Sequence, residues 1–122
     1  MDTTLSASEI RGTLTPPCSK SYAQRALAVS LLCPGRTTLR NLEFCDDTLA
    51  AMRCIEALGA SLRRTDASTL EIDGGLNPRS DRLRVGESGL SARLFTPIAA
   101  LCDRPVVIDG EGTLLKRPMS MM

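Results

Sequence analysis

The chain has 122 residues, a length that suits one ordinary domain. Hydrophobic residues make up 43% and charged residues 24%, which excludes a disordered chain, a collagen and a disulfide-based miniprotein. Fifteen basic residues against fourteen acidic ones leave a net charge of +1. No uniform charge field therefore favours binding to nucleic acid or to an anionic membrane.

The residue types exclude several kinds of site. The chain has no histidine, so imidazole metal centres and Ser-His or Cys-His catalysis are ruled out. Three aromatic residues are too few for a platform on which nucleic-acid bases stack. The odd number of cysteines, without a Cys-x-x-Cys pair, predicts free thiols in a reducing compartment; they are Cys18, Cys33, Cys45, Cys54 and Cys102. With no signal peptide and no apolar run near 20 residues, we expect a cytoplasmic protein outside the membrane.

In the first half of the chain, the apolar spacing predicts two strands and two helices. A short strand over 9–15 ends at Pro16-Pro17, and a helix over 20–33 follows, capped by Ser19 or Ser21. A strand is expected over 37–42, then a helix from Asp46 to Gly59 with acidic residues in its first turn.

The second half begins with a predicted β-hairpin. Its strands cover 61–65 and 69–73, on either side of the turn Asp66-Ala67-Ser68. Further expected elements are a strand over 83–85, a helix over 90–101, a strand over 106–109 and a helix beginning near Pro118.

An offset of 68 residues places Arg25 over Arg93 and suggests an internal repeat. Both arginines lie early in an apolar helix that is followed by a turn and a β-prone segment. We therefore predict an α/β (α+β) fold with one β-α-β-α-β-β unit and an incomplete second one, as in a piece of a longer chain. The simpler alternative is that two helices each carry one arginine in their first turns.

Lys20, Ser21 and Arg25 form the first candidate site. Ser21 and Arg25 share a helix face, and Lys20 lies at the helix N-terminus, where the dipole disfavours cations. A bound phosphate or carboxylate would offset that cost. The alternative is a pair of solvated surface cations.

Two further cations occupy comparable positions. Arg93 follows the glycines of Gly86-Glu-Ser-Gly89, which allow a ligand to approach the backbone. Lys116 and Arg117 precede the expected last helix. The pattern predicts several anionic groups bound at converging helix ends. Asp47 is expected to cap its helix or to orient Lys20.

These segments resemble the N-terminal part of the EPSP synthase family (3-phosphoshikimate 1-carboxyvinyltransferases), within the enolpyruvyl transferases. The resemblance covers nearly the whole chain from about Thr13 and combines Lys-Ser-x-x-x-Arg, Gly-x-x-Gly-x-x-x-Arg and Arg-Pro-Met. The segments that carry it are Pro16 to Leu27, Asn41-Leu with Asp46-Asp47-Thr, Ile55 to Ala60, Gly86 to Arg93 and Gly112 to Met119.

The resemblance implies an enzyme that transfers the carboxyvinyl group of phosphoenolpyruvate to the 5-hydroxyl of shikimate 3-phosphate and releases phosphate. Lys20 would contact both substrates and take part in proton transfer. Ser21 and Arg25 would bind shikimate 3-phosphate. Gly89, Arg93 and Arg117 would hold phosphoenolpyruvate. No metal and no organic cofactor is expected.

The chain departs from the family pattern in two respects. Glu87 and Ser88 stand where Asn-Ala is usual, so the Glu87 carboxylate is expected either to repel phosphoenolpyruvate or to pair with Lys20 or an arginine. The family is also a longer, two-domain enzyme. Residues 1–17 would then be a strand segment of the other domain and residues 18–122 part of a substrate-binding domain, inactive alone.

Two alternatives remain open at this point. A UDP-N-acetylglucosamine enolpyruvyl transferase typically has Asn in place of Ser21 and uses a cysteine that none of the five cysteines matches well. A non-catalytic module that binds anions or RNA would use the same cations without chemistry.

Overall fold

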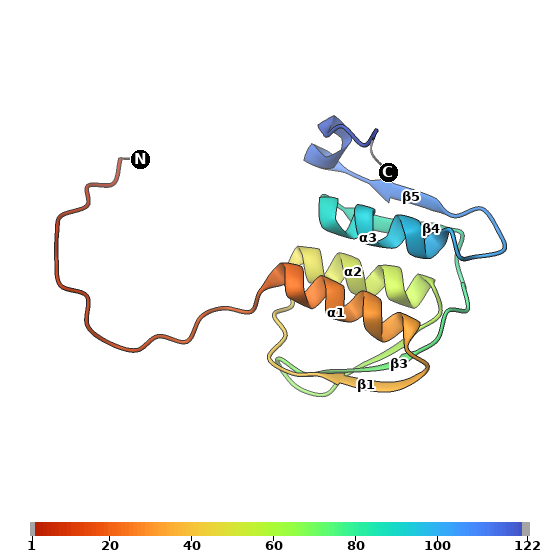
Figure 1. Ribbon diagram of the computed structural model, residues 1–122, viewed down its shortest axis with the longest axis horizontal. Coiled ribbons are helices and arrows are strands. Elements are labelled where there is room, and N and C mark those ends of the chain that lie inside the picture. The colour runs from red at the N-terminus through yellow and green to blue at the C-terminus, as the bar shows by residue number, and fades with distance from the viewer. Residues whose placement is uncertain (1, 121–122) are drawn as a thin grey trace.

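The computed structural model describes residues 2–120, which form three α-helices, five strands and one 3-10 helix (Figure 1). In chain order they are α1 (Lys20–Leu32), β1 (Gly35–Leu39), α2 (Asp46–Ala57), β2 (Ser61–Arg64), β3 (Leu70–Gly74), β4 (Arg82–Gly86), α3 (Gly89–Ala99), β5 (Val107–Gly110) and η1 (Gly112–Lys116). The mixed helix and strand class predicted from the sequence is confirmed.

The strands form two separate sheets with the helices between them. One sheet is antiparallel in the order β1-β3-β2, and the other is the parallel pair β4-β5. Figure 1 shows α1, α2 and α3 side by side, all three beginning on the same side of the molecule. Because the helices run in one direction, their N-terminal ends come together there.

The core is built where these helices meet the two sheets. Alternation in β3 and β4 turns one face of each strand inward, and helical spacing does the same for α1 and α2. The side chains that are 0% exposed include Leu27, Leu31, Ile55, Leu58, Leu70, Ile72, Leu83, Val85 and Phe95.

Gly59 ends α2 as the sequence predicted. Its φ of +122° lies in the region that favours glycine, and a Cβ there would come within 2.5 Å of the Asn77 carbonyl oxygen. The backbone of Asn77 donates to the Leu58 carbonyl at 2.9 Å, so this close approach also satisfies the helix end.

Most of the expected elements form, with small shifts in their ends. The helix at Lys20 has its N-cap at Ser19, whose Oγ accepts from the Tyr22 backbone at 3.4 Å. The helix from Asp46 and the hairpin of β2 and β3 are also confirmed. The strand expected over 37–42 lies earlier, at Gly35–Leu39.

Two expected elements are wrong. Residues 2–19 contain no strand, and Figure 1 shows this segment extending away from the helices. Ile10 is 96% exposed there, because among the described residues no strand edge pairs with the segment. No helix begins at Pro118 either: the 3-10 helix η1 precedes it, and residues 118–120 are not helical. The rest of that expected helix, at 121–122, lies outside the described residues.

Within residues 2–120, no helix is both long enough and apolar enough to cross a membrane.

The packing of α1 has a direct test. Replacing Leu27, which is 0% exposed, by alanine removes buried apolar volume between the helix and the sheet. We expect Leu27→Ala to lower the free energy of unfolding by about 2–5 kcal/mol in a urea titration. Val29→Ala, in the same helix at a position 58% exposed, is the control and should change it by less than about 0.5 kcal/mol. Equal losses would contradict the burial of this helix face.

Candidate functional site

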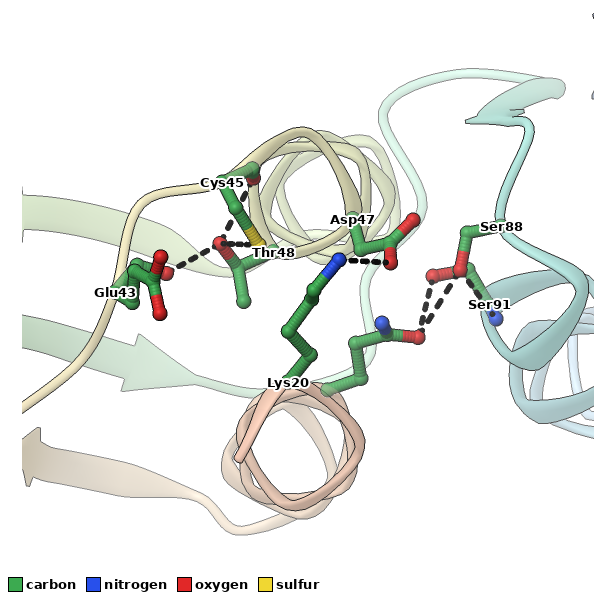
Figure 2. Close-up of polar contacts among 8 residues, drawn as sticks. Lys20, Glu43, Cys45, Asp47, Thr48, Ser88 and Ser91 are labelled. Carbon is green, nitrogen blue, oxygen red and sulfur yellow. Dashed lines mark hydrogen bonds and ion pairs between the residues drawn. The ribbon is translucent and has the colours of Figure 1, made fainter. Parts of the chain in front are cut away.

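Lys20 and Asp47 face each other across the first turns of α1 and α2. The Lys20 Nζ lies 3.5 Å from the Asp47 Oδ2, with the two side chains 58% and 36% exposed. Figure 2 shows Lys20 reaching from α1 toward Asp47. This direct contact agrees with the expectation that Asp47 could orient Lys20. The ion pair leaves Lys20 accessible to a ligand.

A buried polar contact fixes α3 against α1. The Gln24 Oε1 accepts hydrogen bonds from the Ser88 Oγ at 3.1 Å and from the Ser91 Oγ at 3.2 Å. The Ser88 Oγ also accepts from the Ser91 backbone N–H at 3.2 Å and so caps α3. Because all three side chains are buried, this contact sets where α3 begins relative to Lys20.

Arg93 and Arg117 converge on Gly89. A Cβ built on Gly89 would lie 3.0 Å from the Arg93 Nη1 and 3.1 Å from the Arg117 Nη1. The Arg93 guanidinium turns back along α3 and donates to the Gly89 carbonyl at 3.1 Å. The three residues expected to hold phosphoenolpyruvate thus lie together, and a side chain at position 89 would crowd both guanidinium groups.

A hollow of about 440 Å³ opens at these helix ends, and we call it the helix-end cleft. It lies between the beginnings of α1, α2 and α3 and the 3-10 helix η1 with its C-cap. Its lining residues are Lys20, Ser21, Gln24, Asp47, Glu87, Ser88, Gly89, Leu90, Thr113 and Arg117. A second hollow of about 390 Å³ shares Lys20, Asp47 and Glu87 with it.

Arg25 does not line the helix-end cleft. Its exposed guanidinium donates to the Ser21 carbonyl at 2.9 Å, one turn earlier in α1. Arg93 makes the same contact with Gly89, and the two pairs are related by the offset of 68 residues. The two arginines therefore share one side-chain geometry, although Arg93 meets a second arginine and Arg25 does not.

Glu87 hydrogen-bonds to Thr113 rather than pairing directly with Lys20 or an arginine. Its Oε2 accepts from the Thr113 backbone N–H at 2.9 Å and from the Thr113 hydroxyl. The Thr113 hydroxyl, then the Thr113 N–H and the charge of Arg117, hold the pKa of Glu87 below its usual value. Lys20, the expected partner, is paired with Asp47 instead.

The expected position of Lys116 and Arg117 at a helix start is wrong. Lys116 is the last residue of η1, and Arg117 follows as its C-cap. Cations suit the negative end of a helix dipole, so this part of the pattern is not the unfavourable placement that the sequence predicted. Arg117 nevertheless lines the cleft, because the chain after β5 brings it next to Gly89.

The sequence singled out neither Gln24 nor Thr113. Gln24 is buried in the first turns of α1, one residue before Arg25, and a buried amide needs partners. That signal becomes visible only when the helix face is known. Thr113 is exposed and carries no sequence signal beyond its nearness to Arg117. Across residues 2–120, no three His, Cys, Asp or Glu side chains are grouped to hold a metal ion.

A model of the EPSP synthase (3-phosphoshikimate 1-carboxyvinyltransferase) family matches residues 5–122. The chain belongs to this family. The fragment is 35% identical over 121 residues to the 3-phosphoshikimate 1-carboxyvinyltransferase of Methanothermobacter thermautotrophicus, covering 98% of this chain and 29% of the relative. It is 39% identical over 111 residues to the protein of that name from Thermococcus kodakarensis, covering 91% and 27%.

A solved structure of EPSP synthase from Acinetobacter baumannii superposes with a TM-score of 0.79 at 29% identity, over 89% of this chain and 26% of that one. The resemblance stated from the motifs is therefore confirmed. The chain spans between a quarter and a third of the length of these relatives.

The buried thiol of Cys54 should be chemically inert. Cys54 is 0% exposed, and burial raises the pKa of its thiol from 9.0 to about 12. At pH 8 we expect a disulfide reagent such as DTNB to modify the exposed Cys33 quickly and Cys54 only after unfolding in denaturant. Peptide mapping of the modified protein identifies the site. Fast labelling of Cys54 in the folded protein would contradict its burial.

Proposed function

We propose that the chain is the N-terminal part of an enzyme that transfers the carboxyvinyl group of phosphoenolpyruvate to the 5-hydroxyl of shikimate 3-phosphate. Phosphate is released, and the product serves aromatic amino acid biosynthesis. The observation that carries the proposal is the gathering of Lys20, Ser21, Gly89 and Arg117 around one cleft at the helix ends. Membership of the family supplies the reaction.

The physical chemistry of the cleft suits two anionic substrates. Lys20 and Arg117 line it, and Arg93 adjoins it at Gly89. The first turns of α1 and α3 contain no acidic residue, so their positive dipole ends are not neutralised by their own side chains. At an effective dielectric constant near 20, one charge pair at 4 Å contributes about 4 kcal/mol.

The proposed roles follow the family pattern. Lys20 contacts both substrates and takes part in proton transfer, with Asp47 as its neighbour. Ser21 and Arg25 bind shikimate 3-phosphate. Gly89, Arg93 and Arg117 hold phosphoenolpyruvate, where two guanidinium groups match the paired oxygens of a carboxylate or phosphate.

In the reaction, a proton is added to the methylene carbon of phosphoenolpyruvate while the 5-hydroxyl oxygen attacks the neighbouring carbon and loses its own proton. The tetrahedral intermediate then expels phosphate, and loss of a proton from the methyl group restores the vinyl double bond. Fixed cations stabilise the phosphate charge as it leaves, and holding both substrates together removes most of the entropic cost of their encounter.

The rest of the active site belongs to the part of the enzyme outside this chain. We propose that residues 18–122 are part of one substrate-binding domain and that residues 1–17 belong with the other. The free state of all five cysteines supports a cytoplasmic location.

Binding of shikimate 3-phosphate to the 122-residue chain, followed by NMR titration, tests the proposal. We expect Lys20→Ala to weaken binding about tenfold, because it removes a cation from the cleft lining. Arg63→Ala is the charge-matched control, since Arg63 lies in β2, pairs with Glu71 and is not among the residues that line the cleft. Tight, salt-steep RNA binding without binding of shikimate 3-phosphate would instead favour a nucleic-acid module.

Turnover provides a separate check on the missing half. We expect the 122-residue chain to release no phosphate when both substrates are supplied, since part of the proton-transfer machinery is absent. Robust phosphate release in a coupled assay would show that this segment is catalytically complete.

A further inference from the structure

Glu87 places a carboxylate on the wall of the proposed anion cleft. Lys20 and Arg117 line the same cleft, so a free carboxylate there would offset part of their attraction for a phosphate. The contacts of Glu87 point to a different role. They connect the turn between β4 and α3 with the first residues of η1, two segments that lie 26 residues apart in sequence.

The Glu87 carboxylate reaches Arg117 through Thr113. Its Oε2 accepts from the Thr113 backbone N–H at 2.9 Å and from the Thr113 hydroxyl. The Thr113 Oγ1 in turn accepts a hydrogen bond from the Arg117 Nη2 at 3.5 Å. The hydroxyl thus donates to the carboxylate and offers its lone pair to the guanidinium group, so the three side chains form one directed series.

Gly112 makes this series possible. Its φ is +55°, and a Cβ there would lie 2.5 Å from the Glu87 Cδ. Any larger residue would push the carboxylate away from Thr113. The Glu87 carboxylate therefore occupies space that is open only because residue 112 is a glycine.

The series acts on a guanidinium group that needs to be held. The Nη1 atoms of Arg93 and Arg117 both approach Gly89, and their like charges repel each other. Arg117 is exposed, and its backbone N–H donates to the Leu114 carbonyl, which holds the backbone but leaves the long side chain several rotamers. Its side-chain hydrogen bond to Thr113 and the charge of Glu87 favour the converged position.

We propose that Glu87 is a positioning residue that holds Arg117 against Gly89 through the Thr113 hydroxyl. The proposal rests on the proposed function, because it takes Arg117 to be part of the phosphoenolpyruvate site. The proposal also predicts the direction in which the affinity changes. Removal of the Glu87 carboxylate weakens binding of the anionic substrate, whereas removal of a carboxylate that only repelled the substrate would strengthen binding.

Phosphoenolpyruvate titrations of the 122-residue chain and its variants test the direction of this change in affinity. We expect Glu87→Ala to weaken binding about five- to tenfold and Glu87→Gln not to strengthen it. Glu56→Ala, which removes an equal charge from an exposed position on α2, is the control and should change affinity less than twofold. Tighter binding by Glu87→Ala or Glu87→Gln would overturn the proposal.

The hydroxyl of Thr113 is tested by a matched pair. Thr113→Val removes the hydroxyl at nearly constant shape and should weaken binding to a similar extent as Glu87→Ala. Thr113→Ser retains the hydroxyl and should stay within about twofold of the unchanged chain. Equal affinities for the valine and serine variants would show that the hydroxyl does not hold Arg117.

A readout without ligand separates this inference from the proposed function. The Arg117 side-chain Nε–Hε signal in an NMR spectrum should move in Glu87→Ala and Thr113→Val and remain in place in Thr113→Ser and Glu56→Ala. If the unchanged chain binds no phosphoenolpyruvate, the proposed function fails for this segment alone. An Arg117 signal that is the same in all variants overturns the positioning role in either case.

Discussion

The parallel packing of α1, α2 and α3 is the constraint on which the site depends. Helices that run in one direction bring the positive ends of their dipoles together, an arrangement that costs free energy unless negative charge is supplied. In α2 the helix provides this negative charge itself, because Asp46 and Asp47 occupy its first turn. In α1 and α3 the first turns hold no acidic residue, and Lys20 adds a cation. The anionic ligand proposed for these ends would restore the balance.

Buried polar contacts convert this general arrangement into a precise one. Apolar packing tolerates small sliding movements between helices, whereas a buried hydrogen bond is lost when its partners separate. Gln24 bonds to both Ser88 and Ser91, which fixes the start of α3 relative to α1. In the helix-end cleft, Glu87 and Thr113 tie the start of η1 to the turn before α3. Both sets of contacts therefore meet at residues 87–91.

Arg25 and Arg93 illustrate how one local geometry can acquire different surroundings. Arg25 and Arg93 each donate to the carbonyl oxygen four residues earlier, as expected for arginines that lean toward the N-terminus of their helices. Arg93 then meets Arg117 at a buried glycine, and Arg25 remains exposed at a serine. The difference comes from the residues that follow β5.

Several helices and strands could be predicted from the sequence alone, because their signals come from neighbouring residues. The helices beginning at Lys20 and Asp46, the hairpin around Asp66 and the α+β class all follow from apolar spacing, caps and turns, which act between residues close in the chain. The motifs also sufficed to indicate the family. The strand over 9–15 was wrong, because a strand needs a partner and sequence spacing does not supply one.

The contacts between distant segments could not be predicted in this way and depend on the folded arrangement of the chain. The convergence of Arg93 and Arg117 on Gly89, the burial of Gln24 and the pairing of Glu87 with Thr113 depend on contacts between segments distant in the chain. The wrong expectation of a helix at Pro118 has the same origin. Arg117 reaches the cleft because β5 runs parallel to β4 and returns the chain to the helix starts, a consequence of sheet pairing that no local pattern encodes.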